Sequence, residues 1–219
     1  MDAAISGNLI DLCAVAMLLL SMLAMTTTRM AQLLNAFAVQ SLFLAILAFV
    51  VAGSTRHNEL FITGAITLVV KVIWIPWAMR KTTVRMHSGR EVDSTMGIPG
   101  SLLISAILII IAYLVSEPLI GTVGTITSNC FVMSMSVILI GLLMMVTRRK
   151  AMTEAVGLLM MENGLFLGVI SISYSMPLVV EIGVFFDVLM IAVIIGLFAL
   201  RISKAFDSID TSVLRRLKE

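Results

Sequence analysis

Long apolar segments alternate with short polar segments along the whole chain. Seven apolar segments have the length of about 20 residues that a helix needs to cross a bilayer. We place them at residues 9–27, 33–53, 60–79, 99–116, 122–146, 152–173 and 178–201. Hydrophobic residues make up 60% of the chain and charged residues only 13%. The pattern therefore predicts an all-α, polytopic membrane protein with about seven transmembrane helices, and not a soluble domain.

The positions of the 15 Lys and Arg residues predict the orientation of the chain. If the seven segments cross the membrane in alternation, Arg56 lies on one side and Lys71 lies inside a span, while all the others share the opposite side. These others are Arg29, Arg80, Lys81, Arg85, Arg90, Arg148, Arg149, Lys150, Arg201, Lys204, Arg215, Arg216 and Lys218. Positive residues concentrate in cytoplasmic loops. We therefore expect a multi-pass protein of the cell inner (plasma) membrane, with its N-terminus outside and its C-terminus cytoplasmic.

Three charged residues remain near the centres of predicted spans, namely Lys71, Glu162 and Asp187. Their distances from the span centres place them at one depth to within about 3 Å, at 1.5 Å rise per residue. Further polar groups lie nearby along the chain: Gln40 at a similar depth, Asn163 beside Glu162, and Glu181 nearer the outer end of the last span. Ionisable residues inside a membrane usually have a functional role. These six residues are the candidate site.

Two interpretations of the three charges remain open at this stage. Lys71 can form a structural ion pair with one carboxylate and hold the helices together. Alternatively, the groups form a proton path in the plane of the membrane, because one lysine neutralises only one of Glu162 and Asp187 and the other acid needs a proton or another partner. The sequence does not decide which acid Lys71 contacts.

The cysteine and histidine residues give no indication of a cofactor. Cys13 and Cys130 are single residues within apolar segments, and His57 and His87 lie in polar loops. No CxxC pattern that would suggest a zinc or iron–sulfur site is present. We therefore expect no catalytic residues, no metal and no cofactor in this chain, and the apolar composition argues against a nucleic-acid partner.

An internal repeat is one interpretation of the chain organisation. In both halves a helix ends in a Thr-Arg turn, and the next helix carries a polar residue shortly before the tripeptide Leu-Phe-Leu. Chance similarity between apolar segments is the alternative. We divide the chain into a three-helix unit at 1–97, a linking helix at 98–121, and a second three-helix unit with a cytoplasmic tail at 122–219. The segment SEPLIG, residues 116–121, is expected to be a turn, with Pro118 in it.

The second unit resembles a known family of membrane subunits. The basic turn "TRRK" leads to "GLLMMENG", which is similar to the K-type (4L) subunit of respiratory complex I and its Mrp-antiporter relative. Glu162 lies about one helical turn later than the glutamate of those subunits, and Asp187 stands where they have Glu. Over nearly its whole length, with "QSL", "MENG" and "VEIG" as the matching segments, the chain resembles the hydrogenase-4 component E family.

The resemblance implies a role that composition alone does not. It implies a non-catalytic membrane subunit of a complex I-like, energy-converting redox complex, of the group 4 membrane-bound [NiFe]-hydrogenase or formate hydrogenlyase type. The implied partners are antiporter-like and J-type-like membrane subunits and a cytoplasmic redox arm with [NiFe] and iron–sulfur subunits. Glu162, Asp187 and Lys71 would then contribute to the proton-translocation path, with Glu181, Gln40 and Asn163 in support. An Mrp-type cation/proton antiporter component and a purely structural membrane scaffold are the alternatives.

Overall fold

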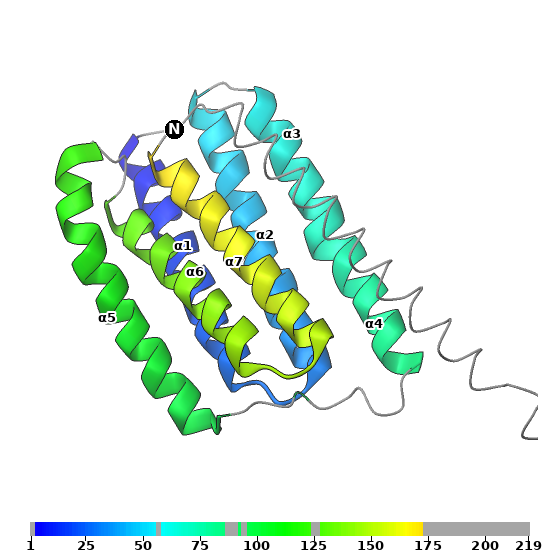
Figure 1. Cartoon of the computed structure of the whole chain (residues 1–219). Helices are drawn as coiled ribbons and strands as arrows, with labels where there is room; N and C mark the ends of the chain where they lie inside the picture. Colours follow the sequence, from blue (N-terminus) through cyan, green and yellow to red (C-terminus); the bar gives the residue numbers. More distant parts are fainter. Residues whose placement is uncertain (1–2, 56–57, 86–91, 93–95, 124–127, 173–219) are drawn as a thin grey trace, which may run out of the picture.

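The computed structural model describes residues 3–55, 58–85, 92, 96–123 and 128–172, and this part of the chain contains helices and no strand. The helices are α1 (Ala3–Thr26), α2 (Met30–Thr55), α3 (Asn58–Thr67), the π-helix η1 (Leu68–Trp74), α4 (Ile75–Arg85), α5 (Ile98–Val123), α6 (Ser128–Thr147) and α7 (Ala151–Ile172). α3, η1 and α4 follow one another without a break and form one long rod (Figure 1).

Six helices in the described residues are long and apolar enough to cross a membrane. They comprise Gly7–Thr26, Met30–Gly53, Phe61–Lys81, Ile98–Pro118, Asn129–Thr147 and Ala151–Ser171. Five of these ranges agree with predicted spans to within three residues at each end, and the remaining one begins at Asn129 where the fifth predicted span begins at residue 122. The prediction of an all-helical protein with several apolar helices of membrane-spanning length is confirmed. The seventh predicted span, 178–201, lies outside the described residues, and the helix count of seven stays a prediction.

Two antiparallel helical hairpins form the centre of the bundle (Figure 1). α1 pairs with α2 and α6 pairs with α7, and the hairpins associate with α1 against α6 and α2 against α7. α5 lies at one edge of this group, and the α3–η1–α4 rod lies at the opposite edge beside α2. The central helices are apolar around most of their circumference because they contact neighbouring helices on one side and face the bilayer on the other.

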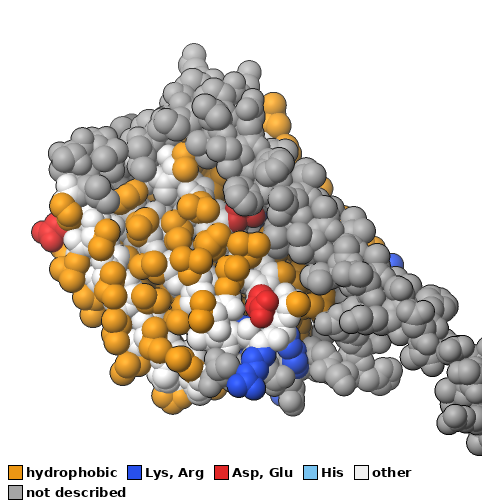
Figure 2. All heavy atoms as spheres, viewed as in Figure 1, with side chains coloured by type: hydrophobic (Ala, Val, Ile, Leu, Met, Phe, Trp, Pro, Cys, Tyr) orange, Lys and Arg blue, Asp and Glu red, His pale blue; other side chains and the backbone are white. Residues whose placement is uncertain are grey.

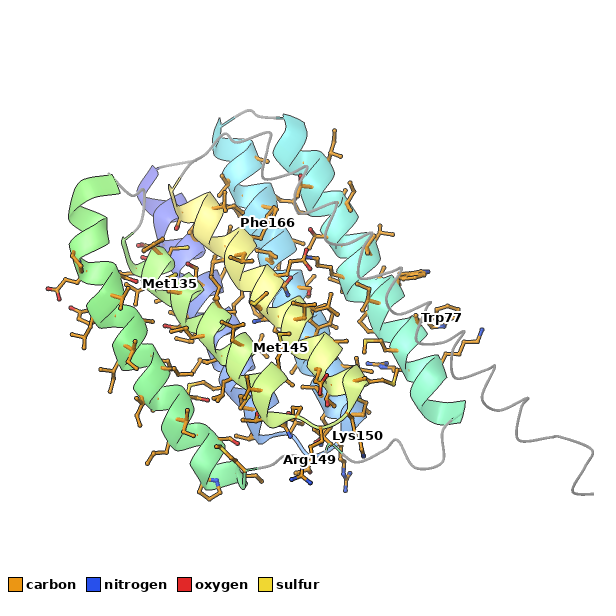
Figure 3. All side chains as sticks on the ribbon, viewed as in Figure 1. Trp77, Met135, Met145, Arg149, Lys150 and Phe166 are labelled. Atoms are coloured by element: carbon orange, nitrogen blue, oxygen red, sulfur yellow. The ribbon has the colours of Figure 1, made fainter. Side chains whose placement is uncertain are left out.

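Glycines on α6 and α7 let these two helices approach closely. A Cβ atom added to Gly141 would lie 2.8 Å from the backbone nitrogen of Met161, and one added to Gly164 would lie 3.0 Å from the nitrogen of Ile138. Met145, which is labelled in Figure 3, packs against Gly157. Small residues at helix contacts are typical of membrane bundles. As a result α7 is the most enclosed of the six spans, and α5 is the least enclosed.

The position of Pro118 differs from the sequence prediction. We expected a turn at residues 116–121, but α5 continues through Pro118 and ends at Val123. Proline removes one backbone donor, and at this place only the last turns of the helix are affected. Continuing the helix gives the backbone polar groups of the residues after Pro118 partners within the helix.

Basic side chains gather at the end of the bundle that carries the α1–α2 and α6–α7 turns. We call this the basic end, and its described residues include Arg29, Arg148, Arg149 and Lys150. Apolar side chains are the commonest kind on the described part of the face in view above it, and α1 begins at the opposite end of the bundle (Figures 1 and 2). Near the basic end, the exposed ring of Trp77 lies 4.9 Å from Nζ of Lys81. Tryptophan beside a cation is typical of a membrane–water interface.

Arg148 connects the two hairpins at the basic end. Its side chain is buried, and its Nη2 donates hydrogen bonds to the carbonyl oxygens of Met25 at 2.7 Å, Ala24 at 3.4 Å and Thr27 at 3.5 Å. The carbonyls of Ala24 and Met25 belong to the last turn of α1, where carbonyls lack partners within the helix, and the carbonyl of Thr27 directly follows α1. A cation at this place also matches the negative end of the helix dipole. Burial lowers the pKa of the Arg148 guanidinium.

Candidate functional site

A buried ion pair joins the α3–η1–α4 rod to α7. Nζ of Lys71 in η1 lies 2.9 Å from Oε1 of Glu162 in α7, and the two side chains are only 3% and 7% exposed. Burying two charges costs several kcal/mol for each ion, which mutual attraction offsets when the contact is close. The sequence left the partner of Lys71 open between Glu162 and Asp187, and the structure pairs it with Glu162.

The π-helix η1 explains how Lys71 faces the bundle. The buried residues Thr63, Thr67, Lys71, Ile75 and Met79 recur every four positions along the rod. Four residues of an α-helix turn by about 40° more than a full revolution, so a strict α-helix would carry this row progressively around its axis. A π-turn contains more residues and reduces that drift. The N–H of Ile75 accordingly donates to the carbonyl of Val70, five residues earlier.

Asn163 extends the site from α7 to α2. Its Oδ1 accepts a hydrogen bond from Nζ of Lys71 at 3.4 Å. Its Nδ2 donates to Oγ of Ser41 at 2.9 Å and to Oε1 of Gln40 at 3.3 Å. Asn163, Gln40 and Ser41 are all completely buried, so these bonds satisfy polar groups that would otherwise be costly inside the bundle.

Gln40 continues the hydrogen-bonded chain to α1. Its Nε2 donates to Oγ of Ser21 at 2.8 Å and to the carbonyl oxygen of Met17 at 3.4 Å. The hydroxyl of Ser21 in turn donates to the same Met17 carbonyl at 2.9 Å. Buried polar groups therefore connect four segments, η1, α7, α2 and α1, across the interior of the bundle.

The structure brings together four of the six residues that the sequence singled out: Lys71, Glu162, Asn163 and Gln40. Asp187 and Glu181 lie outside the described residues. Sequence reasoning missed Ser21 and Ser41. Ser41 directly follows Gln40, and Ser21 interrupts the apolar first span, but serine bonds so readily to its own helix backbone that its presence in a span is a weak signal.

The part of the chain that the structure describes holds no group of three His, Cys, Asp or Glu residues placed to bind a metal ion. Cys13 and Cys130 are free thiols within one buried apolar cluster. The chemistry that the described residues offer is thus that of a charge pair and hydrogen bonds, which can hold, release and orient protons.

Known proteins resemble the chain over most of its length. The protein Rv0085 of Mycobacterium tuberculosis, whose name assigns no function, is 27% identical over 212 residues, or 96% of each chain. Hydrogenase-4 component E of Escherichia coli K12 is 24% identical over 182 residues, which cover 83% of this chain and 84% of that protein. The protein of the same name from Shigella flexneri matches equally well. No protein-family profile and no solved structure matches.

These similarities confirm the resemblance to hydrogenase-4 component E that the sequence predicted. Together with the six apolar helices of the described residues, they indicate a multi-pass membrane protein that fits the membrane part of a complex I-like assembly.

Proposed function

We propose that this chain is a non-catalytic membrane subunit of a complex I-like, energy-converting redox complex of the group 4 hydrogenase or formate hydrogenlyase type. In that complex it contributes to the proton-translocation path within the membrane. The observation that supports this role most directly is the buried Lys71–Glu162 pair, 2.9 Å apart inside an apolar helical bundle. Similarity to hydrogenase-4 component E supports the kind of complex.

The ion pair suggests how a proton is passed on. While Glu162 is ionised, its carboxylate attracts the Lys71 ammonium at close range in a medium of low dielectric constant. A proton that reaches Glu162 removes this attraction, and the lysine then favours another acceptor. We assign Asp187 as that acceptor because the sequence places it at the same depth, and Glu181 as a group nearer the outer surface. Gln40 and Asn163 support the pair with hydrogen bonds.

Redox chemistry belongs to other subunits in this proposal. The partners are antiporter-like and J-type-like membrane subunits and a cytoplasmic arm with [NiFe] and iron–sulfur subunits, and this chain itself holds no cofactor. We place the chain in the inner (plasma) membrane, with the basic end facing the cytoplasm, because positive residues favour that side. The basic end is then the surface nearest to the redox arm.

A structural role is the second candidate, and the same pair favours it. A lysine and a glutamate in contact are neutral as a unit and can hold η1 against α7 without moving protons. Substitutions that separate charge from packing distinguish the two roles, and they are set out in the Discussion.

Isolation of the tagged chain from its native membranes tests the proposed complex. We expect subunits with nickel–iron and iron–sulfur centres to copurify, recognised by metal analysis and mass spectrometry. Copurification of antiporter subunits alone would instead assign the chain to an Mrp-type cation/proton antiporter. A chain that purifies with no other subunit would contradict both assignments.

A further inference from the structure

We propose that Gln40 is a positioning residue for the Lys71–Glu162 pair. It holds the side-chain amide of Asn163 with its oxygen toward Lys71. The polar groups between Asn163 and α1 fix the orientation of this amide and do not carry protons. The inference deepens the proposed function, on which it rests, because it separates the groups that exchange protons from the groups that align them.

The first step of the argument concerns the two donors of the Asn163 amide. Both are directed at α2, one to Oε1 of Gln40 at 3.3 Å and one to Oγ of Ser41 at 2.9 Å. With its NH₂ group held there, the amide can present only its oxygen to Lys71, whose Nζ donates to it at 3.4 Å. Rotation of the amide by half a turn would place a donor against the lysine, which also carries only donors.

The second step concerns the orientation of Gln40 itself. Its NH₂ group donates to Ser21 and to the Met17 carbonyl on α1, so its oxygen faces Asn163. The Ser21 hydroxyl also donates to the Met17 carbonyl. The directions of all these bonds are therefore mutually consistent, and they are anchored on a backbone carbonyl that belongs to a rigid helix.

The third step concerns the hydrogen-bonded groups that lead from Asn163 through Gln40 to α1, which we call the limb. Their chemistry excludes the limb as a route for protons. A backbone carbonyl accepts hydrogen bonds and has no proton to pass on, and a side-chain amide does not exchange its protons as a carboxyl or an amine does. A chain of two amides that ends on the Met17 carbonyl thus terminates at α1. Protons that reach Lys71 and Glu162 leave by another side of the pair.

Solid-state nuclear magnetic resonance of the full chain in lipid bilayers tests the inference. Lysine labelled with ¹⁵N at Nζ and glutamate labelled with ¹³C at the carboxyl carbon report on the contact of Lys71 with Glu162. The Lys71→Arg variant assigns the lysine signal. Magnetisation transfer between the two labels is then measured in Gln40→Met, which keeps the length of the side chain and removes its hydrogen bonds. Gln32→Met is the matched control, because Gln32 lies exposed on the same helix.

We expect Gln40→Met to reduce the population of the close Lys71–Glu162 contact by up to about tenfold, the effect of losing one hydrogen bond near a charge. Ser41→Ala, which removes one of the two acceptors of Asn163, should give a smaller reduction, and Gln32→Met none. If Gln40→Met does not fold, Gln40→Asn takes its place, because it draws the amide back towards α2 by one methylene group. Transfer equal to that of Gln32→Met in the folded variants would overturn the positioning role.

A second measurement separates this inference from the proposed function. In membrane vesicles that contain the complex, Ser21→Ala should lower proton translocation no further than it lowers the Lys71–Glu162 contact, because Ser21 anchors Gln40 at 2.8 Å and carries no protons. Loss of translocation in Ser21→Ala with an intact Lys71–Glu162 contact would show that the limb carries protons, and would overturn the inference while keeping the relay. The magnetic-resonance result stands even if the chain moves no protons.

Discussion

Lys71 and Glu162 are 91 residues apart in the chain, and their side chains meet at 2.9 Å between η1 and α7. The contact places opposite charges together in the interior of an apolar bundle, where each would be costly alone. It also makes the position of the α3–η1–α4 rod dependent on a residue in the other half of the chain. If the proposed relay operates, stability and proton transfer are linked at this one contact.

Removing one member of the pair should be more harmful than removing both charges. We expect Lys71→Met to destabilise the protein by about 3 to 5 kcal/mol, because it leaves a buried carboxylate without its cation. The double variant Lys71→Met with Glu162→Gln should recover most of this loss, since no charge remains. Thermal unfolding of the detergent-solubilised subunit measures the effect, with exposed Lys81→Met as the control. A Lys71→Met protein as stable as this control would show that the pair contributes nothing.

Close packing of α6 on α7 predicts a severe effect of a single methyl group. Gly141→Ala places a Cβ atom 2.8 Å from the Met161 nitrogen, and a backbone atom cannot move aside as a flexible side chain can. We expect a loss of about 1 to 3 kcal/mol in the free energy of unfolding. Gly53→Ala is the control, because a Cβ atom there meets nothing within 4 Å. Equal stability of the two variants would contradict the observed approach of the helices.

The link between Arg148 and the end of α1 predicts a difference between adjacent arginines. Arg148→Met removes the donor from two carbonyls of α1 and from the carbonyl of Thr27 in the following turn. We expect a loss of about 1.5 to 3 kcal/mol, the range for hydrogen bonds to a charged group. Arg149→Met, at an exposed position of the same turn, should have little effect. Thermal unfolding compares the two. A larger loss for Arg149→Met would refute the connection between the hairpins through Arg148.

The charge distribution predicts which side of the membrane each loop occupies. Reporter domains fused after residue 90 and after residue 219 should both be cytoplasmic, because the positive residues concentrate in those segments. Alkaline phosphatase and fluorescent-protein fusions measure the two locations independently. A periplasmic signal from either fusion would overturn the orientation and the helix count on which it depends.

Much of the architecture is predictable because membrane-spanning helices have a length set by the bilayer. The first six spans followed from apolar length alone. The prediction that Lys71, Glu162 and Gln40 share one level agrees with the contacts that connect them through Asn163. The turn expected at Pro118 was wrong because a proline in the last turns of a helix perturbs only a few hydrogen bonds.

Side-chain partners were less predictable, because depth does not determine rotation about a helix axis. Lys71 lies in the wider turn of η1 and contacts Glu162 from there, and the sequence LVVKVIW carries no signal that separates a π-turn from an α-turn. The internal repeat stays a prediction. Aligning the two Leu-Phe-Leu segments makes Gln40 and Asn163 equivalent, and these two residues are hydrogen-bonded to each other in the structure.

The most direct test of the proposed relay is the number of protons translocated per electron by the complex when it carries Glu162→Gln. This substitution keeps the size of the side chain and an acceptor for Lys71 but removes the titration of the carboxyl group. We expect assembly to be retained and the ratio to fall, whereas Glu154→Gln, at a half-buried position in the first turn of the same helix, should leave the ratio unchanged. An assembled Glu162→Gln complex with the same ratio as the Glu154→Gln control would contradict the relay and leave the pair with a structural role.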